Sequence, residues 1–233
     1  YKYAESDHFE ILLFGVSIDG GPVQVYDLAC GDHVPEEILS ALADKSVTKW
    51  AFNASFERIC LSNWLNRNHP EYFLGYSIPE DPAGQYLNPE SWKCTMIWSA
   101  YMGLPLSLEG VGAVLRLQNQ KLKEGKDLIR YFSVPCKPTK TNGGRTRNLP
   151  QHAPEKWATY KKYNAQDVET ERAVYHALLK HPLPEHEWEL YALDQRINDR
   201  GVRIDRLLVK QAMAVDLAFS RQAFKRAQEL TGL

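Results

Sequence analysis

The segments with strand character lie within the first hundred residues of this chain, and helical patterns fill most of the rest. A short apolar run at 9–18, a turn at 19–22 and an alternating run at 23–28 predict a β-hairpin. Further short strands are expected at 48–52 and from Trp92 onward, the second running directly into a helix. Strands followed by helices indicate an α/β or α+β domain with a small mixed β-sheet flanked by helices.

Apolar residues at helical spacing predict where the helices lie. The expected helical segments are 35–42, 55–66, 106–117, 123–131, 154–180, 184–199 and 206–230. Asn53, just before one of these segments, and Ser107, near the start of another, are expected to cap the two helices. Residues 133–154 carry four prolines, two adjacent glycines and no periodicity, which predicts a long flexible loop.

Composition fits a globular protein. The chain has 233 residues, of which 44% are hydrophobic, enough for one good-sized domain and a further piece. It contains no apolar run long enough to cross a bilayer and no signal-peptide pattern, so no membrane partner is expected. Its four scattered cysteines form no C-x-x-C pair, which predicts reduced thiols in a cytoplasmic protein rather than disulfides or a zinc site.

The net charge of −1 hides an uneven distribution. Residues 1–115 hold 6 Lys/Arg against 15 Asp/Glu, whereas residues 116–147 hold 9 Lys/Arg and 2 Asp/Glu. A local excess of positive charge is what a site for a polyanion needs. A solvated helix face followed by a mobile basic loop explains the same pattern equally well.

Two pairs of residues spaced four apart are candidates for chemistry. Tyr163 and Asp167 share one face of a predicted helix, where the carboxylate suits Mg²⁺ or Mn²⁺ and the phenol can bind a metal-bound water or a phosphate. Asn53 and Glu57 follow directly after a predicted strand. Each pair also has a purely structural explanation: a half-buried Tyr with a solvated Asp, and an acidic side chain that favours the helix dipole.

The order of these pairs carries a resemblance to a known family. Asn53-x-x-Phe56-Glu57, followed about a hundred residues later by Tyr163-x-x-x-Asp167, resembles the second and third motifs of the DEDD 3′–5′ exonucleases, tyrosine subtype. That domain is the proofreading part of family A DNA polymerases and has a ribonuclease-H-like fold.

Two further stretches agree with this resemblance. Gly201-Val202-Arg203-Ile204-Asp205 is similar to the segment with which the polymerase part begins, and residues 104–108 fit the region between the second and third motifs. The resemblance is closest to the phage or prophage branch and covers 9–233. It implies an exonuclease domain at 1–182 and the helical start of a polymerase part at 183–233.

The resemblance implies two-metal hydrolysis of the 3′-terminal phosphodiester of single-stranded DNA, with Mg²⁺ or Mn²⁺ ions roughly 3.5–4 Å apart. Asp167 would ligate the ion that carries the attacking water, Tyr163 would orient that water, and Glu57 would contribute to the second ion. Asn53 and Phe56 would place the terminal nucleotide. The implied partners are single-stranded or primer-template DNA and the polymerase domain of the same parent chain. Four basic residues of the predicted loop are candidates for the DNA backbone: Lys137, Lys140, Arg145 and Arg147.

Two departures from the family lower the expected activity. The second motif usually has Asp where this chain has Glu57, and the first motif, Asp-x-Glu on the first strand, is absent. The chain therefore resembles a fragment cut at both ends, with a gap in its sheet or a strand supplied by another molecule. An intact five-stranded sheet formed by residues 1–100 would contradict this. The alternative function is a catalytically incompetent module that docks DNA or braces the polymerase.

Overall fold

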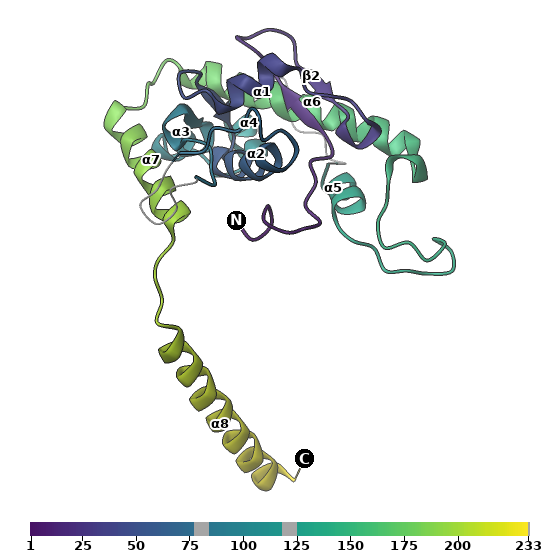
Figure 1. The fold of residues 1–233 in the computed structure, drawn as a ribbon, viewed down its shortest axis with the longest axis vertical. Coiled ribbons are helices and arrows are strands. Elements are labelled where there is room, and N and C mark those ends of the chain that lie inside the picture. Colours follow the sequence, from purple (N-terminus) through teal and green to yellow (C-terminus); the bar gives the residue numbers. More distant parts are fainter. Residues whose placement is uncertain (77–83, 118–124, 233) are drawn as a thin grey trace. The chain divides into compact units, whose positions relative to one another are not determined.

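A computed structural model describes residues 1–76, 84–117 and 125–232. Within these residues the chain is a mixed α/β protein with eight α-helices and two small sheets, which confirms the expected mixture of elements (Figure 1). It divides into two compact units, Tyr1–Arg196 and Ile197–Leu233. The predicted assignment of 1–182 to an exonuclease domain and of 183–233 to a polymerase part stays a prediction.

The predicted hairpin is present. Strand β1 (Phe14–Val16) pairs antiparallel with β2 (Gln24–Tyr26), and Gly20 has the positive φ, +77°, that the connecting turn requires. The two later strands are also confirmed: β3 (Lys49–Ala51) pairs in parallel with β4 (Trp92–Cys94). In the described part of the chain these pairs form two separate two-stranded sheets. The described strands therefore agree with the expected gap, and they form no five-stranded sheet.

The helices follow the predicted segments closely, and residues 123–124 of one expected helix lie outside the described residues. Their bounds are α1 Glu36–Ala43, α2 Ala54–Asn68, α3 Thr95–Tyr101, α4 Leu108–Val114, α5 Gly125–Ser133, α6 Pro154–Leu178, α7 Glu185–Arg200 and α8 Arg206–Thr231.

Of the two expected caps, one is confirmed and one is wrong. Ser107 Oγ accepts a hydrogen bond from the Gly110 N–H at 3.1 Å, as a helix cap should. Asn53 has a left-handed backbone, with φ of 74°, and its side chain makes no capping hydrogen bond. Because an N-cap residue needs an extended backbone to turn its side chain back onto the helix, Asn53 presents its amide elsewhere.

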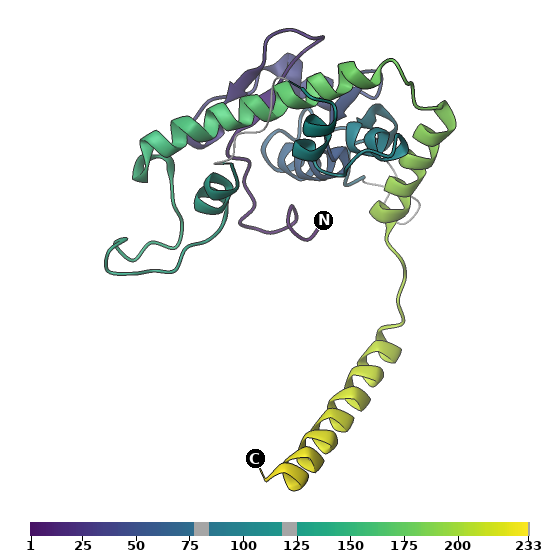
Figure 2. The ribbon, with the colours of Figure 1, turned by 180° about the vertical axis from the view of Figure 1, so that it is seen from behind.

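Helix α6 is the element on which the first unit is assembled. It contacts both strands of the hairpin and also α3, α4 and α5 (Figures 1 and 2). A cluster of aromatic rings packs near its C-terminal end, where Tyr175 lies 4.8 Å from the Trp50 ring on β3. The indole of Trp98 donates a hydrogen bond to the His181 carbonyl at 2.8 Å and so ties α3 to the chain beyond α6.

The loop between α5 and α6 has no helix or strand from Val134 to Leu149, as predicted, but it is closed by specific hydrogen bonds. The Cys136 N–H donates to the Thr146 carbonyl at 2.8 Å. Inside that closure the Asn142 amide donates to the Lys137 carbonyl at 2.9 Å and accepts from the Thr139 N–H at 2.9 Å. The predicted long loop is thus closed into a folded turn by its own hydrogen bonds.

Among the residues whose structure is described, no helix combines the length and the apolar character that crossing a membrane requires.

Candidate functional site

The predicted Tyr163–Asp167 pair lies in the middle of α6, and the face beside it is seated on the hairpin. A β-carbon at Gly15 of β1 would overlap the side chain of Asn164, so the strand and helix backbones come unusually close. Val168, one turn further along, lies against the same glycine. Within the described residues, Asn164 Oδ1 is buried without a hydrogen-bond partner. A polar acceptor thus points into the region between β1 and α6.

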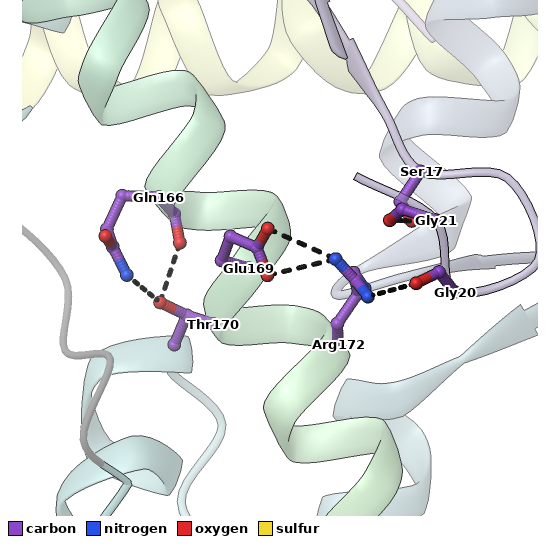
Figure 3. Close-up of polar contacts among 7 residues, drawn as sticks. All are labelled: Ser17, Gly20, Gly21, Gln166, Glu169, Thr170 and Arg172. Atoms are coloured by element: carbon purple, nitrogen blue, oxygen red, sulfur yellow. Dashed lines mark hydrogen bonds and ion pairs between the residues drawn. The ribbon is translucent and has the colours of Figure 1, made fainter. Parts of the chain in front are cut away.

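The hairpin turn is held to α6 just beyond this position. Figure 3 shows Arg172 reaching from the helix to Glu169 and to the turn: Nη1 lies 3.0 Å and 3.1 Å from the two carboxylate oxygens, and Nη2 donates to the Gly20 carbonyl at 2.7 Å. Ser17 Oγ closes the turn by donating to the Gly21 carbonyl at 2.7 Å. The guanidinium therefore fixes the distance between the hairpin and the helix that carries Asp167.

A third contact between the hairpin and α6 lies on the N-terminal side of Tyr163 and Asp167. Asp27, which is buried just after β2, accepts a hydrogen bond from the Trp157 indole at 2.7 Å and lies 3.1 Å from the Lys161 ammonium. Burial alone would raise the pKa of Asp27, but the hydrogen bonds from Trp157 and Lys161 hold it below its usual value. The two ends of the hairpin are thus fixed on either side of Tyr163 and Asp167.

The tyrosine itself is a core residue. The Tyr163 ring is 3% exposed and stacks on Tyr160 with ring centres 6.2 Å apart, and Gly125 of α5 leaves room for it, since a β-carbon there would overlap the ring. Burial first, and then the negative charge of Asp167, raise the pKa of the phenol. Tyr163 therefore keeps its proton at neutral pH and acts as a hydrogen-bond donor.

A second acidic group, Glu57, lies in the first turn of α2. Its acidic neighbour, Glu171, was not predicted from the sequence. Burial raises the pKa of Glu57 to about 8, and the negative charge of Glu171 adds to the effect. Glu171 Oε1 accepts a hydrogen bond from Thr95 Oγ1 at 3.1 Å, at the carboxyl end of β4. Burial raises the pKa of Glu171 to about 7. Glu171 could have been found from its position four residues after Asp167, because that spacing places both on the same face of α6.

The other predicted residues are distributed as follows. Asn53 and Phe56 are exposed at the start of α2, next to Glu57. Lys137 and Lys140 are exposed on the folded turn, but the two arginines are already engaged. Arg145 Nε donates to the Asn148 amide at 2.9 Å, and Arg147 forms an ion pair with Glu10 at 2.6 Å. The structure thus leaves the two lysines as the freer candidates for a phosphate backbone.

The carboxylates are chemically suited to a hard divalent cation, but their arrangement is incomplete as a metal site. No group of three or more His, Cys, Asp or Glu side chains in 1–76, 84–117 and 125–232 is arranged to hold a metal ion. A two-metal site needs more oxygen ligands than Glu57 and Asp167 provide. These residues by themselves do not complete the centre that the sequence resemblance implies.

Comparison with known proteins gives one informative match. The chain is 48% identical over all 233 residues to a DNA polymerase of Bacillus phage SP02, and it spans 33% of that protein's length. No family model matches the chain. No solved structure matches it either. The chain is thus similar along its whole length to about a third of a phage DNA polymerase.

Proposed function

We propose that this chain is the proofreading 3′–5′ exonuclease domain of a phage-type DNA polymerase of family A. The proposal rests on the Tyr163–Asp167 turn of α6, found in a chain that is similar throughout to part of a phage DNA polymerase. The reaction would be hydrolysis of the 3′-terminal phosphodiester of single-stranded DNA. Primer-template DNA and the polymerase domain of the same parent chain would be the partners.

The arrangement of elements supports a ribonuclease-H-like fold. An antiparallel hairpin, a parallel strand pair and a long helix seated on the hairpin follow one another along the chain, and such elements are compatible with strands flanked by helices. The acidic groups stand on the helices that follow or cover those strands, where the sheet fixes their position. The proposal would place the scissile bond over the middle of α6.

Each predicted residue has a role under this proposal. Asp167 and Glu57 would hold Mg²⁺ or Mn²⁺, which supplies charge neutralisation at the phosphate when bound. Tyr163, protonated at neutral pH, would donate a hydrogen bond to the attacking water or to a phosphate oxygen. Asn53 and Phe56 would contact the terminal nucleotide, and Lys137 and Lys140 would contact the backbone.

The test uses single-stranded DNA labelled at its 3′ end, incubated with the chain and Mn²⁺. The proposal predicts release of the labelled nucleotide by the wild type and its loss in Asp167→Ala. Asp216→Asn, which changes an exposed aspartate of α8, is the matched control and should keep the wild-type rate. DNA labelled at the 5′ end should give a ladder that shortens from the 3′ side. Equal degradation by Asp167→Ala would show that the site lies elsewhere.

A second candidate function is a DNA-docking or bracing module without nuclease activity. The absence of a three-ligand acidic group from the described residues favours it, as does the pKa of Glu57 near 8, since a protonated carboxyl is a poor metal ligand. Under this alternative the chain retains single-stranded DNA on a filter but releases no nucleotide at any Mn²⁺ concentration.

A further inference from the structure

A row of aromatic rings lies along the N-terminal half of α6, where α5 packs against it. Trp157, Tyr160 and Tyr163 follow one another at intervals of three residues, so consecutive members are neighbours on the helix surface. Trp157 and Tyr163 are buried in one hydrophobic cluster with Phe132 of α5, and Tyr160 packs against that cluster. The roles proposed for Tyr163 and Asp167 leave Tyr160 without one.

Tyr160 connects a ring of α5 to the ring of Tyr163. Its plane makes an angle of 14° with the Phe132 ring, at a centre-to-centre distance of 5.6 Å, and an angle of 14° with the Tyr163 ring, at 6.2 Å. Both distances lie in the range in which offset aromatic rings attract one another. The Trp157 ring is nearly perpendicular to Phe132, with ring centres 4.8 Å apart. Three nearly parallel rings thus lead from α5 to the candidate site.

Helix α5 presents one face to this stack. Its buried residues Gly125, Leu128 and Phe132 recur at the spacing of a single helical stripe. The first of them is a glycine, and a β-carbon at that position would overlap Cε2 of the Tyr163 ring. The Tyr163 ring is therefore confined twice, by Gly125 at one edge and by the stacked ring of Tyr160.

The plane of the Tyr163 ring matters for the role proposed for this residue. Conjugation keeps a phenol O–H close to the plane of its ring, so that plane sets the direction in which the hydroxyl donates a hydrogen bond. We propose that Tyr160 is a positioning residue, which fixes the plane of the Tyr163 ring and so directs its hydroxyl at the water or phosphate oxygen that Tyr163 would contact. This inference rests on the proposed function and adds a residue that the sequence pattern did not assign.

The ring of Tyr160, rather than its hydroxyl, carries this role. The hydroxyl lies 3.3 Å from Oγ of Ser133, an exposed residue at the C-terminal end of α5. Removing that hydroxyl leaves both stacked contacts in place. Tyr160→Phe is therefore the conservative variant, whereas Tyr160→Leu keeps apolar bulk but removes the ring.

The first experiment needs neither metal nor DNA. The 233-residue chain, with ¹³C at the ε ring carbons of its tyrosines, is studied by NMR in EDTA, and Tyr163→Phe identifies the Tyr163 signals. Because Gly125 and Tyr160 confine the ring, it should flip slowly and give separate signals for its two edges. Tyr160→Leu should lose this separation and Tyr160→Phe should keep it. Tyr101→Leu, which changes an exposed tyrosine at the end of α3, should also keep it.

The second experiment measures single-turnover release of the terminal nucleotide from 3′-labelled single-stranded DNA in Mn²⁺. Tyr160→Leu should slow release about 2- to 10-fold at saturating protein, the range expected for the loss of one aromatic pair, and should leave DNA affinity unchanged. In a Tyr163→Phe background the same change should have no effect, because no hydroxyl is left to direct. Tyr160→Phe should release at the wild-type rate.

The inference is overturned if the wild type gives one merged Tyr163 signal or if Tyr160→Leu keeps the two separate. It is also overturned if Tyr160→Leu slows release equally with Tyr163 and with Tyr163→Phe, since Tyr160 would then act on the fold alone. A wild type that releases no nucleotide contradicts the proposed function instead, and the ring signals still decide whether Tyr160 fixes Tyr163.

Discussion

At the residue scale, the candidate site contains three side chains whose pKa values are raised, so they keep their protons to higher pH than usual. Glu57 and Glu171 have pKa values raised to about 8 and about 7, and Tyr163 is pushed further above its ordinary value. In each case burial is the largest cause. Acidic groups kept close together in a poorly solvated place are typical of sites that a cation or a substrate completes.

The raised pKa of Glu171 has a consequence for stability. A carboxyl that binds its proton more tightly in the folded state contributes stability that is fully present below its unfolded pKa and is lost as pH rises through its folded pKa. For Glu171 this window runs from about 4.5 to about 7. Glu171→Gln removes this titration, so it should gain stability relative to the wild type between pH 5 and pH 8, on the order of 1–3 kcal/mol. Urea unfolding at the two pH values measures this.

Asp216→Gln is the control, since it alters an exposed carboxyl of α8. A Glu171→Gln stability difference that stays constant from pH 5 to pH 8 would show that Glu171 ionises normally in the folded protein.

Asp27 gives a prediction of the opposite sign. Its pKa is lowered by Trp157 and Lys161, so the stability that it contributes is present above its unfolded pKa of about 3.8 and is lost as pH falls through the folded value. Asp27→Asn should therefore lower the free energy of unfolding by about 1–3 kcal/mol at pH 7, because it weakens a buried polar contact. The loss should be smaller at pH 3. Asp216→Asn, at an exposed position of α8, provides the comparison. An equal cost at both pH values would contradict the charge-assisted contact.

At the element scale, α6 and the hairpin behave as one piece because the contacts between them are spread along the helix. Asn164 meets Gly15 on the strand, Arg172 meets the turn, and Trp157 meets the end of β2 through Asp27. Contacts roughly two turns apart fix both the rotation and the translation of a helix. The acidic face of α6 is therefore positioned by the hairpin.

Removing one of these contacts should speed up amide hydrogen exchange in the hairpin without unfolding the protein. Arg172→Ala removes the bond to the Gly20 carbonyl and the pairing with Glu169, so amide hydrogen exchange should speed up about 5- to 10-fold in β1 and β2, corresponding to about 1 kcal/mol. Arg172→Lys should restore part of the protection because it keeps a charged donor. Exchange that is unchanged in the hairpin but faster in α7 would contradict the assignment of this contact.

The α5–α6 contact offers a sharper steric test. A β-carbon on Gly125 would overlap the Tyr163 ring, so Gly125→Ala should destabilise the protein by about 1–3 kcal/mol, even though alanine favours helices. Gly112→Ala, in α4, is the matched control, because a β-carbon there meets only Thr170 at 3.9 Å. Thermal unfolding of the two variants should differ clearly. If Gly125→Ala is as stable as the wild type, α5 does not lie against Tyr163.

The sequence predicted where the helices and strands lie, but it did not predict which side chains pair across the fold. Apolar periodicity located the hairpin, both later strands and the helices, since local sequence determines local geometry. It missed Glu171, whose partner Thr95 lies 76 residues away. It also left Arg147 available for DNA, although Glu10, 137 residues away, binds it. Long-range pairing of this kind leaves no periodic signal.

At the scale of the whole molecule, three features stand out. The first unit holds every candidate residue, and the second consists of the end of α7, an extended link and α8. Helix α8 has no buried residue, although it carries large apolar side chains such as Phe219 and Phe224. The chain also spans only 33% of the phage polymerase that it resembles.

The division of the chain into two units predicts where a protease will cut. Val202 and Ile204, in the link before α8, are 81% and 64% exposed, and exposed extended backbone is the preferred substrate of proteases. Brief digestion with thermolysin should therefore cleave between 201 and 206 before it cleaves the first unit. Mass spectrometry of the early products measures this. Early cleavage within α2 or α6 would contradict the division.

The Tyr163–Asp167 turn of α6 is the proposed exonuclease site. Single-turnover release of a 3′-terminal nucleotide, followed over a range of Mn²⁺ concentrations, tests it most directly. Under the proposed function, release depends on Mn²⁺, falls at least about 100-fold in Asp167→Asn and falls less in Tyr163→Phe, because the first change would remove a proposed metal ligand and the second only a proposed hydrogen-bond donor. Release that is independent of Mn²⁺, or equal in the wild type and Asp167→Asn, would contradict it.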